Sequence, residues 1–272
     1  GRGLELHAPA VKVAARELGI PVTQPTKVRT PDFLAWVEEQ RADVAVVIAY
    51  GRILTPAVLA APKHGCMNLH ASILPRYRGA APINWCIVRG EKETGISLMQ
   101  MDEGMDTGPV FTVRRIAIGE NETAGELAGR LAELGAEVVR QDIPRAVRGE
   151  LQAAPQDHAA ATAAPPLEKQ QGRIDWTRPA AEVHDHVRGM TPWPSAFTTS
   201  GGKMLKVLAT KRSNLGANEA PGTIVAADTS GVLVACGQGV LEITRAQVEG
   251  KKALDARDLV SGRTLVRGAR LG

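Results

Sequence analysis

The chain has 272 residues, of which 44% are hydrophobic and 23% are charged. It is long enough for two ordinary domains, and no apolar run reaches the roughly 18 residues of a membrane-spanning helix. The formal net charge of +4 is unevenly spread: residues 1–168 carry 18 Lys and Arg against 20 Asp and Glu, and residues 169–272 carry 15 against 9. The basic second half predicts contact with an anion such as nucleic acid, although a solvated basic surface explains the charge equally well.

The cysteines and the first residues predict a cytoplasmic location. Cys66, Cys86 and Cys236 lie far apart and form no CxxC pair, which argues against a disulfide scaffold or a zinc finger and fits a reducing compartment. The opening residues GRGLELHAPA lack the apolar core of a signal peptide. Three scattered thiols are expected to be small buried hydrophobic groups.

The first 150 residues alternate between helical and strand-like patterns. Residues 43–50 (DVAVVIAY) form a continuous apolar run, which is typical of a strand buried on both faces of a parallel sheet. Thr30 and Thr123 have the positions of helix caps. The alternation predicts an α/β, Rossmann-like, open and mostly parallel sheet. The other expected elements are helices at 10–18, 82–89 and 123–138 and strands at 67–70, 94–101 and 110–118.

The pattern changes after residue 150. Residues 151–168 are rich in Ala, Pro and Gln without a large apolar stripe, and are therefore predicted to be a linker between domains 1–150 and 169–272. A helix is expected at 179–189. Short strands between Gly- and Asn-rich turns then predict a small antiparallel β-barrel. These strands are expected at 203–210, 222–227, 232–236 and 240–244.

The candidate catalytic residues lie between positions 66 and 109. Asn68 and His70 are two apart on a predicted strand, so both side chains should face the same side. Asp106 follows the strand ISLMQM in the loop DEGMDTG. If the two strand ends are adjacent, the three side chains form a carbonyl-chemistry site. Asn would donate to an oxyanion, His would shuttle a proton, and Asp would orient the His.

Each of these motifs has a simpler explanation when taken alone. The Asn-X-His pair could be structural, and PRYRG (75–79) could be a surface turn. DEGMDTG could be a turn or a divalent-metal loop, but it lacks the ligand series of a calcium-binding hand. The combination of the three motifs is what favours catalysis.

The combined motifs resemble the folate-dependent formyltransferases, and within them the methionyl-tRNA formyltransferase family. The resemblance rests on NLHASILPRYRGAAPINW (68–85) and TGISLMQMDEGMDTGP (94–109). It continues through GRIDW, TPWPSAF, APGTIV and GKKALDARDL to the C-terminal part, which resembles the family's OB-like barrel. The Asn-X-His pair and the distant Asp are shared more widely, whereas LPRYRGAAPI and MQMDEGMDTGP are more specific.

The resemblance implies transfer of a formyl group from 10-formyltetrahydrofolate to the α-amine of initiator methionyl-tRNA, for translation initiation. It assigns Asn68 as a donor to the tetrahedral oxyanion, His70 as a donor of a proton to N10, and Asp106 as the group that holds the imidazole. No metal is needed, because the formyl group is already activated on folate. No membrane or protein partner is implied.

The resemblance also implies a folate cleft and a tRNA surface. The residues expected to bind folate are Ser72, Ile73, Leu74 and Pro75, the loop residues Tyr50, Gly51, Ile53 and Leu54, and Asp102. The tRNA candidates are Arg2, Arg76, Arg78, Lys203, Lys206, Lys251 and Lys252, with Lys211 and Arg212 as further basic residues.

The start of the sequence departs from the family. As the resemblance suggests, members of the family begin with a strand, a helix and a second strand, roughly 40 residues before the point that corresponds to the start of this chain. The sequence is therefore expected to be a fragment or an incomplete gene product that folds poorly alone. Two other functions stay open: another folate-dependent N-formyltransferase or formyltetrahydrofolate hydrolase, or an inactive RNA-binding fragment.

Overall fold

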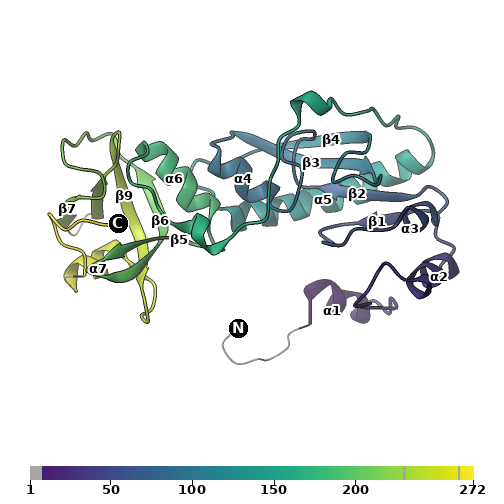
Figure 1. Ribbon diagram of the computed structural model, residues 1–272, viewed down its shortest axis with the longest axis horizontal. Helices are drawn as coiled ribbons and strands as arrows, with labels where there is room; N and C mark the ends of the chain where they lie inside the picture. The colour runs from purple at the N-terminus through teal and green to yellow at the C-terminus, as the bar shows by residue number, and fades with distance from the viewer. Residues whose placement is uncertain (1–7, 229–230, 263) are drawn as a thin grey trace.

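The computed structural model describes residues 8–228, 231–262 and 264–272. Figure 1 shows an elongated molecule with one sheet at each end and helices α4 and α6 packed between them. The strands are β1 (Ala45–Val47), β2 (Cys66–His70), β3 (Glu93–Gln100), β4 (Val110–Ala117), β5 (Ala196–Ser200), β6 (Lys203–Arg212), β7 (Ile224–Asp228), β8 (Gly231–Ala235), β9 (Val240–Val248) and β10 (Leu254–Asp255). The α-helices are α1 (Ala10–Glu17), α2 (Pro31–Glu39), α3 (Pro56–Ala60), α4 (Pro82–Val88), α5 (Ala124–Val147), α6 (Ala180–Gly189) and α7 (Ala256–Ser261). No helix within the described ranges has the length and apolarity to cross a membrane.

The first sheet is mixed, with the strand order β1-β2-β3-β4. Only β1 and β2 run parallel, and both β2–β3 and β3–β4 are antiparallel. The prediction of a mostly parallel sheet is therefore wrong for the described strands. The chain leaves β2 at His70, passes through α4 and enters β3 near the same end of the sheet, because His70 pairs with Ser97. The loop 101–109 then closes an antiparallel pair with β4.

Strand β1 differs from its prediction as well. The run 43–50 was expected to form a strand buried on both faces, but only three of its residues pair with β2. Val46 is 41% exposed and Ile48 is 57% exposed. The reason is position, since β1 lies at the sheet edge and only its Ala45 and Val47 pack against the α2–α3 side.

Helix α5 covers one face of this sheet and thereby determines where the polar residues of β2 point. Thr123 and Glu126 form the predicted capping box at its start. Its buried face packs against β3 and β4, and Gly135 lies against Leu69 of β2 (Figure 1). Because side chains alternate along a strand, Asn68 and His70 point to the opposite face.

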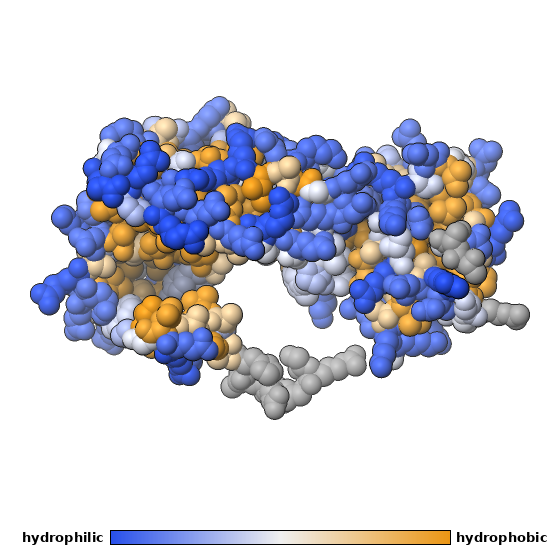
Figure 2. Space-filling view, turned by 180° about the vertical axis from the view of Figure 1, so that it is seen from behind, coloured by the Kyte–Doolittle hydropathy of each residue, from blue (hydrophilic) through white to orange (hydrophobic). Residues whose placement is uncertain are grey.

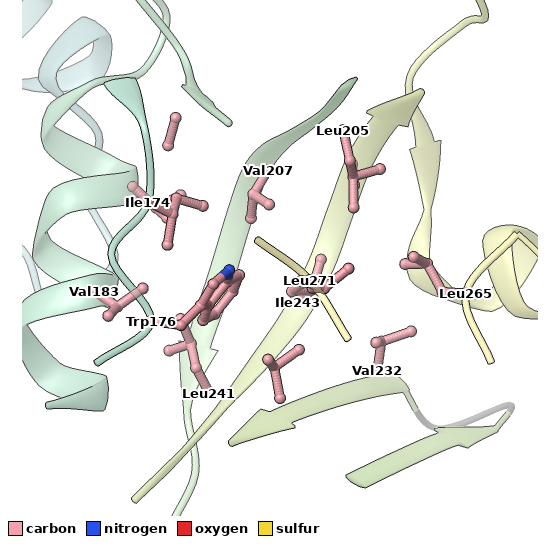
Figure 3. Packing of buried hydrophobic residues seen from close by; sticks show 14 of the residues in the cluster. Ile174, Trp176, Val183, Leu205, Val207, Val232, Leu241, Ile243, Leu265 and Leu271 are labelled. Carbon is pink, nitrogen blue, oxygen red and sulfur yellow. The ribbon is translucent and has the colours of Figure 1, made fainter. Parts of the chain in front are cut away.

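The second sheet is antiparallel throughout, as the short predicted strands indicated. Its order is β5-β6-β9-β8-β7, with β10 paired to β9. Figure 3 shows Trp176 in the middle of its core, near Val183 of α6 and Leu241 of β9. The Trp176 indole N–H donates to Thr198 at 3.1 Å, which satisfies its polar atom inside the apolar cluster.

A buried polar seam joins the two halves. Arg188 of α6 is 4% exposed, and its guanidinium donates to Asp185 at 2.9 Å and to the backbone carbonyl of Glu122 at 3.2 Å. His184 lies 3.1 Å from the carbonyl oxygen of Glu120, and burial lowers the pKa of its imidazole. These contacts connect α6 to the β4–α5 turn. Since every charged group is paired, the seam satisfies the condition for burying charge.

Candidate active site

Asn68 and His70 lie on the face of β2 that α5 leaves free. Strand β2 is the second strand of its sheet, between β1 and β3, and its residues are buried except for a half-buried Asn68. His70 is 6% exposed. The spacing of two residues therefore places an amide and an imidazole side by side on a rigid strand, as the sequence predicts.

Asp106 reaches these residues by a route that the sequence did not predict. The two strand ends were expected to be adjacent, but β3 is antiparallel to β2, so Gln100 lies beside Met67 at the amino end of β2. The loop 101–109 begins there and folds back along the sheet. Asp106 adopts a φ of 54°, in the left-handed region, where the loop turns.

Asp106 is the point at which three segments meet. Its Oδ1 lies 3.5 Å from Asn68 Nδ2 and its Oδ2 lies 3.6 Å from His70 Nδ1. The Gly79 N–H donates to Oδ2 at 2.8 Å, which is its shortest contact. The two longer distances exceed a normal hydrogen bond, and catalytic contacts of this kind shorten when substrate is bound. The carboxylate is thus anchored by the loop after β2 and aimed at both strand residues.

The contact of the other imidazole nitrogen fixes the orientation of the His70 ring. Nε2 lies 2.8 Å from the carbonyl oxygen of Tyr77. A carbonyl can only accept, so Nε2 carries a hydrogen and donates it. Nδ1, the nitrogen that faces Asp106, is therefore the ring atom at which a proton can be gained or lost while the Nε2 contact is kept.

Tyr77 itself is firmly held, which fixes the carbonyl that His70 contacts. The residue is 4% exposed, and the guanidinium carbons of Arg76 and Arg89 lie 5.3 and 5.1 Å from the centre of its ring. Its hydroxyl donates to Glu91 at 2.6 Å. Burial raises the pKa of Tyr77 to about 12, so the hydroxyl stays a donor at neutral pH.

The predicted linker packs against the site. The backbone of Arg78 donates to Thr162 at 2.8 Å and accepts from Ala164 at 2.6 Å. Gly79 has a φ of 116°, and a Cβ there would lie 2.7 Å from the Ala164 carbonyl oxygen, so only glycine fits. The side chain of Gln156 is 9% exposed and also contacts the loop of Asp106.

The first group of predicted folate residues lies next to this predicted linker, residues 151–168, which is here called the strap. Leu74 and Pro75 line a cavity of about 330 Å³ together with β4 and residues 154–157. Ser72 is fully buried, and its hydroxyl donates to the Arg76 carbonyl at 2.6 Å. Ile73 is half-buried. The polar side chain of Ser72 therefore holds the loop, whereas its neighbours border open space.

The second group lies on the loop that follows β1, apart from Asp102, which lies in the loop after β3. Tyr50 is 43% exposed, Ile53 is 62% exposed and Gly51 is exposed, whereas Leu54 is buried in the α2–α3 cluster. None of them has a hydrogen bond or ion pair with Asn68, His70 or Asp106 within the described ranges. Asp102 accepts from Gly104 and Thr107 and so stabilises the turn of its own loop. It also borders a cavity of about 470 Å³ between α3 and the end of β3.

Four of the basic candidates gather at one end of the second sheet. Lys203 and Lys206 lie on β6, and the β6–β9 register places them beside the end of β9, after which Lys251 and Lys252 follow. Three of these side chains are exposed and Lys206 is half-buried. They therefore form a shared positive edge, here called the lysine edge.

The remaining basic candidates already have partners or lie elsewhere. Arg76 pairs with Glu91, and the guanidinium of Arg78 donates to Gln156 at 2.6 Å. Lys211 and Arg212 lie at the other end of β6, where Arg212 contacts Asp185 at 3.2 Å. Arg2 lies outside the described residues.

Sequence reasoning missed the groups that hold the site in shape. They are the Gly79 N–H, the Tyr77 carbonyl, and Gln156 and Thr162 of the predicted linker. Backbone groups leave no mark in a sequence, and the low hydrophobicity of 151–168 concealed its packing. The described residues contain no group of three His, Cys, Asp or Glu side chains that could hold a metal ion.

The chain is similar to known proteins over almost its full length. A family model described as formyl transferase matches residues 2–143, and one described as formyl transferase, C-terminal domain, matches residues 166–264. A methionyl-tRNA formyltransferase of Sorangium cellulosum is 65% identical over all of this chain and 88% of its own length.

Solved structures share the fold at lower identity. HypX from Aquifex aeolicus, solved in complex with tetrahydrofolic acid, has a TM-score of 0.63 and 20% identity, and the match covers 85% of this chain and 41% of that one. A methionyl-tRNA formyltransferase from Clostridium thermocellum has a TM-score of 0.56 and 19% identity, over 75% of this chain and 87% of that one. At these identities the likeness concerns the fold alone.

Proposed function

Because this chain belongs to the methionyl-tRNA formyltransferases, a group of folate-dependent formyl transferases, we propose that Asn68, His70 and Asp106 carry out its formyl transfer. The formyl group comes from N10 of 10-formyltetrahydrofolate, and the acceptor is the α-amine of methionine on initiator tRNA. The observation that carries this proposal is the convergence of an amide, an imidazole and a carboxylate on one face of β2.

The reaction needs one developing negative charge to be stabilised and two protons to be moved. The amine attacks the formyl carbon, a C–N bond forms, and the carbonyl electron pair moves to oxygen. Asn68 has two amide hydrogens, one directed to Asp106 and one free for that oxyanion. When the intermediate collapses, the C–N10 bond breaks and N10 takes the Nδ1 proton of a His70 ring that carries hydrogen on both nitrogens. The proton that Asp106 receives from the amine then returns to Nδ1.

Asp106 has two tasks in this scheme. It orients His70 by facing Nδ1, while the Tyr77 carbonyl fixes Nε2. It also accepts the proton that the amine loses, through a water molecule. The Gly79 N–H keeps the carboxylate in place for both tasks.

The folate cosubstrate is proposed to lie beside this triad. The apolar cavity bordered by Leu74 and Pro75 suits an aromatic ring system, and Ile73 precedes them. The exposed loop of Tyr50, Gly51 and Ile53 and the turn of Asp102 are proposed to complete the cleft when the cosubstrate is bound. The residues present supply backbone and apolar contacts, which fit a pterin.

The second sheet is proposed to form an OB-like barrel. Its C-terminal segment supports closure, because Leu271 donates to the Gly222 carbonyl next to β7, and Gly272 donates to Thr199 on β5. The last residues thus bridge the two edges of the sheet. Small barrels of this type bind single-stranded nucleic acid along a positive groove.

The lysine edge is proposed to meet the phosphates of the tRNA. Figure 2 shows a wide opening between the α1 region and the second sheet, where the surface is hollowed. A tRNA lying across the second sheet and this opening would bring its 3′ end toward the β2 loop. Arg78 and Arg76 lie on that loop, and Arg76 remains 49% exposed.

The acceptor identity is tested by offering the purified protein two substrates with radiolabelled 10-formyltetrahydrofolate. Label is expected in methionyl-tRNA and not in an amino-sugar nucleotide, since the basic second sheet matches a polyanion. Transfer to the sugar would support the other N-formyltransferase function. Salt-sensitive binding of tRNA without any transfer would mark the chain as an RNA-binding protein only.

Charge reversal tests the lysine edge. Changing Lys251→Glu and Lys252→Glu together is expected to raise KM for methionyl-tRNA by about tenfold and to flatten its salt dependence, because two phosphate contacts are lost. Steady-state kinetics at several salt concentrations measure both effects. Arg140→Glu with Lys92→Glu, both exposed on the first domain, is the matched control. An unchanged KM in the Lys251/Lys252 variant would exclude this edge.

A further inference from the structure

The side chain of Gln156 connects the interdomain strap to the loop of Asp106. Its Nε2 donates to the carbonyl oxygens of Asp106 at 2.9 Å and of Gly108 at 2.7 Å. Its Oε1 accepts from Arg78 at 2.6 and 3.2 Å. The orientation of the amide follows from chemistry, since a carbonyl only accepts and a guanidinium only donates. Both polar atoms of the Gln156 side chain are therefore hydrogen-bonded, and the residue is only 9% exposed.

We infer that Gln156 is a positioning residue for formyl transfer, which fixes the backbone of Asp106 through its two amide hydrogens. The inference rests on the role proposed above for Asp106. Gln156 has no hydrogen bond with Asn68 or His70 within the described ranges, so its effect on these two residues is inferred to pass through the backbone of Asp106.

The local backbone explains why this loop needs an outside anchor. Asp106 has a positive φ, which a residue other than glycine adopts only when its surroundings hold it. The Asp106 side chain depends on a single short contact, from Gly79. The two hydrogen bonds from Gln156 to the carbonyls of Asp106 and Gly108 restrict both the position and the orientation of that turn. A displacement of about 1 Å at a reacting group costs on the order of a hundredfold in rate.

Two substitutions separate the donor side of Gln156 from its acceptor side. Gln156→Met keeps the length and removes every hydrogen bond. Gln156→Glu keeps an oxygen for Arg78 but places another oxygen against the two carbonyls of the loop. If Gln156 acts through Asp106, both variants lose turnover. If it acts only by holding Arg78, Gln156→Glu retains turnover and Gln156→Met loses it.

The expected result is a fall in kcat of about tenfold to a hundredfold in both variants, with KM for methionyl-tRNA changed by less than about threefold. Gln152 lies in the same strap with an exposed side chain, so Gln152→Met and Gln152→Glu are matched controls that should behave as wild type. Thermal melts identify any variant that fails to fold. A Gln156→Glu protein with wild-type kcat would overturn the inference.

A double-mutant cycle shows whether the effect passes through Asp106. In an Asp106→Asn background, Gln156→Met is expected to cost less than about twofold more in kcat, because the group it positions is already disabled. A purely structural defect would lower kcat by the same factor in both backgrounds, and that outcome would contradict the inference. If Asp106→Asn alone turns over normally, the proposed role of Asp106 fails instead. The two failures are therefore distinguishable.

Discussion

Asp106→Asn is expected to lower kcat for formyl transfer by on the order of 10²–10⁴, the range of a lost general base or acid. Asn is nearly the same size as Asp, and its carbonyl oxygen can still accept from the Gly79 N–H. What disappears is the negative charge that faces His70 Nδ1 and that is proposed to receive the proton of the amine. Single-turnover formylation assays measure the chemical step directly.

The control for Asp106→Asn is Glu103→Gln, which removes a negative charge from an exposed position of the same loop. It should leave kcat within about twofold of wild type, since a screened surface charge contributes little. Turnover by Asp106→Asn within about threefold of wild type would remove Asp106 from the mechanism. Equal melting temperatures of the two variants would show that any loss is chemical.

Asn68→Ala is expected to lower kcat by on the order of 10²–10³, with KM for both substrates little changed, because an oxyanion donor acts mainly in the transition state. The residue is half-buried and its contact with Asp106 is long at 3.5 Å. Its removal should therefore reduce the free energy of unfolding by no more than about 1.5 kcal/mol. Urea unfolding and steady-state kinetics on the same sample measure the two quantities.

Asn68→Asp complements the alanine variant. The carboxylate has the same shape as the amide but no hydrogen to donate, and it would face the carboxylate of Asp106. It should be at least as inactive as Asn68→Ala. If Asn68→Asp kept most of the activity, the oxyanion would have to be stabilised by another group.

Local features of the fold were predictable from the sequence because they depend on neighbours along the chain. Thr30 and Thr123 accept from Phe33 and Glu126 as capping residues should. The shared face of Asn68 and His70 follows from the alternation of a strand. Short strands with regular turns also predicted the antiparallel second sheet correctly.

Non-local features were not predictable in this way. The direction of β3 depends on how α4 returns the chain, and an apolar strand reads the same in either direction. The route of Asp106 over the sheet follows from that direction. The apolar run 43–50 could not reveal that β1 would be an edge strand. The role of Gln156 was not predictable either, because the polar strap has no periodic pattern that would indicate packing.

The seam around Arg188 has a consequence for the distance between the two sheets. Separating α6 from the β4–α5 turn would keep the Arg188–Asp185 pair within α6 but would remove the contacts of the buried Arg188 guanidinium with the carbonyls of Gly119 and Glu122, at a cost of about 1–3 kcal/mol for each unsatisfied group. These contacts therefore oppose a change in the distance between the two sheets. If the lysine edge holds the tRNA, the span from that edge to Asn68 acts as a ruler. A methionyl group is then formylated only on a carrier whose length matches the span.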